Sequence, residues 1–128
     1  MKKTISTFEN IQELVDEFYI KVREDELIGP VFNQVIENRW DEHLKKMYSF
    51  WQTILLKEHT YIGSPFPPHE RLPIEKKHFE QWLCLFMKTI DENFYGDIAV
   101  QAKWRAQKMA EIFEIKIHDS QQKNQTYR

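Results

Sequence analysis

The chain has 128 residues, of which 41% are hydrophobic and 30% are charged, and its formal net charge is −2. This length suits one domain with a single core, and the composition is that of a globular protein rather than a disordered one. The small net charge provides no basic surface for a nucleic acid, and no apolar run is long enough to cross a bilayer. No apolar segment of a secretory signal follows the basic start, and a single cysteine, Cys84, fits a reducing compartment. We therefore expect a cytoplasmic protein without membrane or nucleic-acid partners, and we expect Cys84 to be a small buried side chain.

The first third of the chain predicts one long helix and one short helical turn. Ser6 and Glu9 have the spacing of a capping box. Apolar residues then recur at helical spacing as far as about Glu24. Gly29-Pro30 interrupts this pattern, and residues 31–32 are expected to form a short turn of helix against the core.

The remainder predicts three further helices and one long connection. A helix begins near Asn38, and periodicity stops between about residues 58 and 73, where proline is frequent. Such long connections are often functional. The next helix covers about Glu75–Phe94, and Gly96-Asp97 separates it from a last helix, which is followed by a polar tail over residues 119–128. The pattern predicts an all-α domain.

Few residues could carry chemistry, and most familiar sites are excluded. The chain has five histidines, none of them paired at the spacing of a zinc site. One Glu-x-x-His pair, Glu75 with His78, lacks the second pair that a di-iron bundle requires, and no nucleophile elbow is present. His69 follows a double proline and precedes an apolar helix that carries Trp82. A single histidine suffices as a ligand for iron already held by a porphyrin, but an ordinary loop histidine remains the alternative from these residues alone.

Aromatic residues make up 14% of the chain, including four Trp and nine Phe. Many large aromatic side chains in a small core indicate either dense packing or a wall around a flat apolar ligand. Composition does not separate these two interpretations.

Several segments together resemble the truncated haemoglobins, and most of all their group III. The segment from His69 to Leu83 is similar to the proximal region of that family. The upstream segments that carry the resemblance are Val15-Asp-Glu-Phe-Tyr19, Gly29-Pro-Val-Phe32, Trp40-Asp-Glu-His43 and Phe50-Trp51. The absence of a Gly-Gly pair favours group III over groups I and II. The resemblance implies a two-over-two helical sandwich around one haem b, formed by residues 1–118.

The resemblance also implies a set of site residues. His69 would be the proximal ligand of the haem iron, and Tyr19 and Trp82 would be distal hydrogen-bond donors. His43 would donate to the ligand, gate its entry or simply face solvent. The other expected haem contacts are Met47, Phe50 and Trp51 in the pocket, with Lys46 and Arg71 near the propionates. For Lys46 and Arg71, a solvated surface charge is the alternative.

Two donors beside bound O₂ predict slow O₂ release, which is a poor property for simple oxygen transport. We therefore expect chemistry between O₂ and NO, or with a peroxide, of a nitric oxide dioxygenase- or peroxidase-like kind. CO would also bind, an unidentified reductase would serve the iron, and the chain would be a monomer or weak dimer. The alternatives are a non-haem helical metalloprotein built on Glu75 and His78, a haem sensor, and a helical interaction module.

Overall fold

The computed structural model describes residues 2–58 and 74–126, and within these ranges the regular elements are helices. They are α1 (Phe8–Glu24), α2 (Gly29–Ile36), α3 (Trp40–Leu56), α5 (Lys76–Asn93) and α6 (Asp97–Thr126). One isolated bridge joins Lys3 to Phe94. The predicted all-α class is thus confirmed. None of the described helices has both the length and the apolar character needed to cross a membrane.

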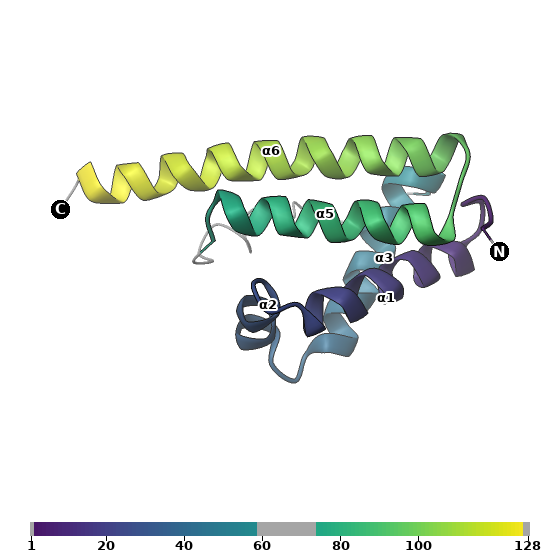
Figure 1. Ribbon diagram of the computed structural model, residues 1–128, viewed down its shortest axis with the longest axis horizontal. Helices are drawn as coiled ribbons and strands as arrows, with labels where there is room; N and C mark the ends of the chain where they lie inside the picture. Colours follow the sequence, from purple (N-terminus) through teal and green to yellow (C-terminus); the bar gives the residue numbers. More distant parts are fainter. Residues whose placement is uncertain (1, 59–73, 127–128) are drawn as a thin grey trace.

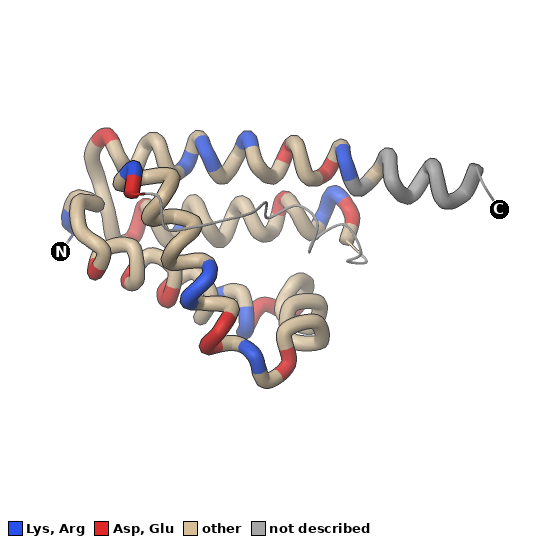
Figure 2. The backbone as a smooth tube through the Cα atoms, turned by 180° about the vertical axis from the view of Figure 1, so that it is seen from behind, with Lys and Arg blue, Asp and Glu red and all other residues tan. Residues whose placement is uncertain are grey.

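The helices form two layers. Figure 1 shows α5 and α6 lying side by side as one layer, with α1 crossing beneath α5. Helix α1 packs against α3, which completes the second layer, and also against α5 and α2. This is the two-over-two arrangement that the resemblance implied. In Figure 2, Lys and Arg are interspersed with Asp and Glu along the described helices rather than gathered by sign.

The start of α1 differs from the prediction by one residue. Thr7, not Ser6, is the N-cap, and its hydroxyl accepts the backbone N–H of Asn10 at 3.2 Å. The Asn10 side chain accepts the Thr7 N–H in return, at 3.1 Å. An asparagine at this position therefore replaces the glutamate that usually closes a capping box, which is why the pattern pointed to Ser6 and Glu9. The predicted end of α1 at Glu24 is confirmed.

Helix α2 is a full helix of eight residues rather than the short turn that the sequence predicted. Pro30 lies in its first turn, where a proline costs no hydrogen bond. Gly29 permits α2 to start directly against the end of α1, because a Cβ there would lie 2.9 Å from the carbonyl oxygen of Val22. A side chain at position 29 would therefore separate the two helices.

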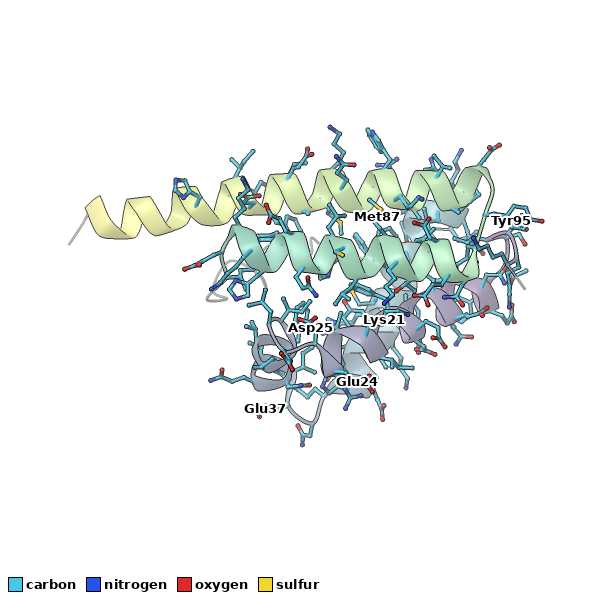
Figure 3. The ribbon with its side chains drawn as sticks, viewed as in Figure 1. Lys21, Glu24, Asp25, Glu37, Met87 and Tyr95 are labelled. Carbon is cyan, nitrogen blue, oxygen red and sulfur yellow. The ribbon has the colours of Figure 1, made fainter. Side chains whose placement is uncertain are left out.

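Asp25 joins three segments at this corner. Its Oδ2 accepts the backbone N–H groups of Leu27 and Ile28, at 3.0 and 2.9 Å. Its Oδ1 accepts the side-chain amide of Gln81 on α5, at 2.6 Å. In Figure 3 Asp25 lies where the end of α1 approaches α5. The carboxylate thus connects α1, the start of α2 and α5.

The centre of the core is an aromatic cluster. Phe18 on α1 and Phe86 on α5 are 1% and 0% exposed, and their rings meet edge to face with centroids 5.2 Å apart. Trp51 on α3 stacks on Phe86 with a centroid distance of 4.9 Å. Such pairs contribute about 0.5–1.5 kcal/mol each beyond the area they bury. The cluster fixes the relative positions of α1, α3 and α5, and hence of the residues next to Phe18 on α1.

Two features of α5 and α6 bear on the sequence predictions. Cys84 is exposed, so the expectation of a buried cysteine is wrong. It lies off the apolar stripe of α5, whose buried members include Phe79 and Phe86. Gly96 adopts a positive φ of 99° between the two helices, as a glycine readily does. Helix α6 continues to Thr126, through much of the segment expected to be a tail.

Candidate functional site

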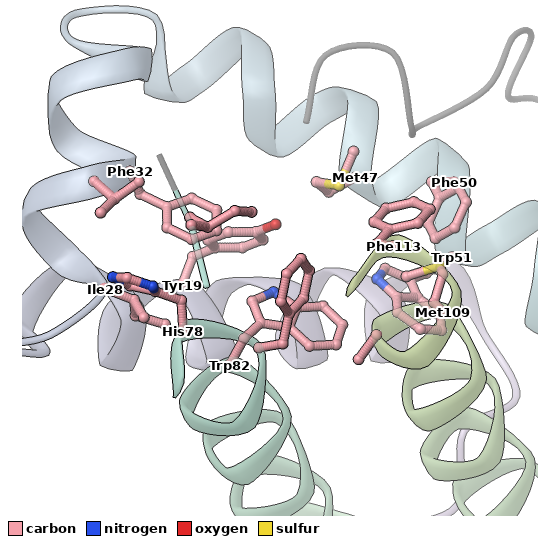
Figure 4. A pocket seen from close by; sticks show the side chains of 14 residues that line it. Tyr19, Ile28, Phe32, Met47, Phe50, Trp51, His78, Trp82, Met109 and Phe113 are labelled. Carbon is pink, nitrogen blue, oxygen red and sulfur yellow. The ribbon is translucent and has the colours of Figure 1, made fainter. Parts of the chain in front are cut away.

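A pocket lies where α2, α3, α5 and α6 approach the second half of α1 (Figure 4). Its empty space, including the opening to solvent, is about 710 Å³. The lining residues are Tyr19, Ile28, Val31, Phe32, Met47, Phe50, Trp51, Ile74, His78, Phe79, Trp82, Met109, Ala110 and Phe113.

Tyr19 brings a hydroxyl into this apolar pocket. The residue is 6% exposed, and its ring packs edge to face against Phe18 at 4.9 Å and against Phe32 at 6.2 Å. Figure 4 shows its oxygen pointing into the pocket. Burial raises the pKa of the Tyr19 phenol well above its ordinary value of 10. The hydroxyl therefore keeps its proton and remains a hydrogen-bond donor throughout the physiological range.

Trp82 lines the same pocket from α5. Its ring is held between Phe18, met edge to face at 5.5 Å, and Phe86, on which it stacks with an interplanar angle of 9°. An indole N–H can donate a hydrogen bond but cannot accept one. In Figure 4 the Trp82 nitrogen is on the side of the ring that faces the pocket. The fold thus brings Tyr19 and Trp82, far apart in sequence, to one pocket.

His43 lies beside Tyr19 and is not one of the residues that line the pocket. Its ring meets the Tyr19 ring edge to face at 5.1 Å and the Trp40 ring at 5.7 Å. The residue is half-buried and its Nε2 atom is buried. The Arg23 guanidinium lies 4.6 Å over the Trp40 ring. His43 is therefore placed to orient the Tyr19 side chain.

The other predicted site residues divide into three groups. Met47, Phe50 and Trp51, all on α3, line the pocket. Lys46 is 65% exposed, does not line the pocket and lies 4.0 Å from the carboxylate of Glu42. His69 and Arg71 lie outside the described residues. Contact of all these residues with haem stays a prediction.

Sequence reasoning missed part of the wall, including Ile28, Phe32, Met109 and Phe113. Met109 and Phe113 lie at helical spacing on the apolar stripe of α6, which indicated burial but not a pocket. His78 is half-buried in the first turn of α5, and it also lines the pocket. The sequence feature that could have indicated this position is the spacing of four residues between His78 and Trp82, which places both on one face of the helix.

The pair Glu75 and His78 serves the helix rather than a metal. The Nδ1 atom of His78 accepts the backbone N–H of Glu75 at 2.9 Å, as in a capping box. Among the side chains that the structure describes, no three of His, Cys, Asp or Glu are grouped to hold a metal ion.

The pocket is suited to a flat apolar group that itself binds a small polar ligand. Its walls are aromatic and aliphatic, and several apolar side chains on it remain only half-buried: Val31, Phe32, Met47, Met109 and Phe113. A macrocycle placed against them would remove apolar surface from water, which is favourable by roughly 25 cal/mol per Å². Tyr19 and Trp82 add two hydrogen-bond donors to this otherwise largely apolar wall. Two crossed helix pairs around such a pocket define a haem-binding globin.

Comparison with known proteins agrees with this class. The bacterial-like globin family model matches residues 3–119. The chain is 36% identical over 110 residues to the group 3 truncated hemoglobin ctb of Campylobacter jejuni, covering 83% of this chain and 87% of that protein. The crystal structure of a group III truncated hemoglobin from Campylobacter jejuni has a TM-score of 0.84, 35% identity, and coverage of 91% of this chain and 95% of the other. The chain belongs to the bacterial-like globin family, and within it to the group III truncated haemoglobins.

Proposed function

We propose that this globin binds one haem b through His69 and retains O₂ in the pocket for reaction rather than for transport. The observation that carries the proposal is the presence of two hydrogen-bond donors, Tyr19 and Trp82, on an otherwise largely apolar wall. The single cysteine supports a reducing, cytoplasmic location.

Haem, when bound, supplies an iron with one position open to small ligands such as O₂, NO and CO. The chain supplies the rest of the site. His69 would offer a neutral imidazole nitrogen to the iron, with its second nitrogen free to donate to a neighbouring carbonyl. Met47, Phe50 and Trp51 would cover one part of the macrocycle and exclude water from it.

Tyr19 and Trp82 would hold the ligand. The phenol of Tyr19 stays protonated because burial raises its pKa, and the indole of Trp82 can only donate. A hydrogen bond to an acceptor that carries charge is worth about 1.5–3 kcal/mol, which corresponds to release of O₂ that is about ten to a hundred times slower. His43 supports Tyr19 by packing edge to face against its ring.

Slow release favours reaction over transport. With NO as the second substrate, one O₂, one NO and one electron combine to nitrate, and an unidentified reductase would supply the electron. With a peroxide, the same two donors would polarise the O–O bond. Nitrate formation at the rate of NO consumption would support the first reaction, and its absence under aerobic, reducing conditions would exclude it.

The donor roles are tested by O₂ release from the haem-loaded, reduced protein, measured in a stopped-flow instrument as CO replaces O₂. We expect Tyr19→Phe with Trp82→Phe to release O₂ at least about tenfold faster than wild type. The matched control is Tyr95→Phe with Trp104→Phe, because these two residues are 57% and 54% exposed. An unchanged rate in the first pair would remove both donors from the mechanism.

The cofactor assignment is tested by the absorption spectrum of the purified protein, reduced and then exposed to CO. We expect a Soret band that shifts with CO, and its loss or alteration in His69→Ala. His118→Ala is the control, since His118 is exposed and does not line the pocket. A fully pigmented His69→Ala with an unaltered spectrum would refute the axial role of His69. A colourless wild-type protein would favour the interaction module instead.

A further inference from the structure

His78 lines the pocket but has no role in the function proposed above. It lies one helical turn before Trp82 on α5, and its side chain is half-buried. Figure 4 shows the His78 ring at the opposite end of the pocket from Trp51 and Met109. Among the described lining residues, it is the one with an imidazole.

The start of α5 determines which ring nitrogen of His78 carries the proton. Nδ1 accepts the backbone N–H of Glu75 at 2.9 Å, and a nitrogen that accepts a hydrogen bond has no proton of its own. In the neutral ring the proton is therefore on Nε2. Because the Nδ1 edge of the ring is occupied by the helix cap, the Nε2 edge is the one left for the pocket. His78 thus presents a donor of defined position.

The surroundings of this donor favour an anion. Lys76 and Lys77 occupy the first turn of α5, and each ammonium lies 4.0 Å from a carboxylate, that of Glu80 and that of Glu75. The N-terminal end of a helix also carries partial positive charge. The acidic side chains nearest in sequence, Glu75 and Glu80, are 69% and 67% exposed, and neither lines the pocket. An anionic group at this end of the pocket would meet the Nε2–H donor of His78 and the partial positive charge of the helix end.

We propose that His78 is a cofactor-binding residue that donates its Nε2–H to a propionate carboxylate of haem. The inference rests on the proposed function, because it names a further residue that holds the same cofactor. The capping bond to Glu75 fixes the tautomer and the ring orientation, so the donor is in place before the cofactor arrives. Its effect is to slow the loss of haem rather than to change the chemistry at the iron.

The test measures haem loss from the ferric protein to an excess of apomyoglobin, for wild type, His78→Asn and His78→Glu. Both variants retain an acceptor for the helix cap, because Asn10 performs this role in α1 and glutamate is the usual residue in a capping box. We expect about tenfold faster loss in His78→Asn, as for one hydrogen bond to a carboxylate at a partly exposed site, and faster loss still in His78→Glu. Thermal unfolding of the apoproteins verifies that the cap is retained, and His118→Asn is the matched control.

A parallel measurement replaces haem by its dimethyl ester, in which both propionates lack charge. We expect wild type and His78→Asn to lose the ester at the same rate. Equal loss of ordinary haem by both proteins, or the same acceleration with the ester, would overturn the role of His78. Failure of the wild-type protein to bind either pigment would instead overturn the proposed function on which the inference depends.

Discussion

The carboxylate of Asp25 offers a direct test of how the pocket walls are held together. It accepts three hydrogen bonds, from the backbone of Leu27 and Ile28 and from the side chain of Gln81. Ile28 lines the pocket, and Gln81 precedes Trp82 on α5. Replacement of Asp25 by alanine would therefore loosen the contact between the start of α2 and α5.

The expected loss of stability in Asp25→Ala follows from these three hydrogen bonds. At about 0.5–1 kcal/mol each for a partly exposed acceptor, Asp25→Ala should lower the free energy of unfolding by about 2 kcal/mol. For a domain of this size that corresponds to a fall in Tm of about 6–10 °C. Thermal unfolding at neutral pH measures it, and Glu26→Ala is the control because Glu26 is exposed. A Tm for Asp25→Ala within about 1 °C of wild type would refute the argument.

The pH dependence gives a second and independent test. Burial raises the pKa of the Asp25 carboxyl, but hydrogen bonds from Ile28, Gln81 and Leu27 outweigh it, and the net pKa is below the ordinary value of 3.8. A carboxyl with a lowered pKa in the folded state stabilises the protein above its unfolded pKa, and this contribution is lost as the pH falls through the folded pKa. The difference in Tm between wild type and Asp25→Ala should thus be full at neutral pH and should shrink below about pH 4. A difference that stays constant into this acidic range would contradict the assignment.

Three further outcomes follow from other parts of the structure. Phe86→Ala removes a fully buried ring from the aromatic cluster and should lower the free energy of unfolding, measured in urea, by about 3–5 kcal/mol. A decrease of less than about 1 kcal/mol would contradict the central place of Phe86 in the core. Burial and the hydrogen bond to Asp16 raise the pKa of Tyr48 to about 12. The contribution of Tyr48 to stability is therefore present below pH 10 and lost as the pH rises towards 12. Tyr48→Phe should lower Tm at neutral pH, and the difference in Tm between this variant and wild type should narrow above pH 10. Cys84, being exposed, should react with a thiol reagent in the folded protein nearly as fast as in urea, and strong protection would show that it is covered.

Much of the secondary structure could be read from the sequence because helices depend on local patterns. Apolar residues at helical spacing located α1 as far as Glu24 and α5 within one residue of each boundary, and Gly96 marked the turn before α6. The resemblance likewise placed Met47 and Trp51 in the pocket, and both line it from α3. The order of the motifs, taken with the family resemblance, was sufficient for the fold.

Local detail was less predictable where two residue types compete for one role. Thr7 and Asn10 form the cap expected of Ser6 and Glu9, because an asparagine side chain can reach back to the N-cap backbone as a glutamate does. Composition favoured burial of Cys84, but its position on α5 is on the exposed side.

The amino-acid sequence alone determined the helices, their apolar faces and the residue types available for a haem site. Only the tertiary structure decided which faces meet: that His43 packs on Tyr19 beside the pocket, and that His78 lines it while capping its own helix. The physical reason is the separation along the chain between the residues that interact. Helix formation and capping involve residues three or four positions apart, whereas a pocket wall depends on how whole helices pack, and that is settled by contacts between residues distant in the chain.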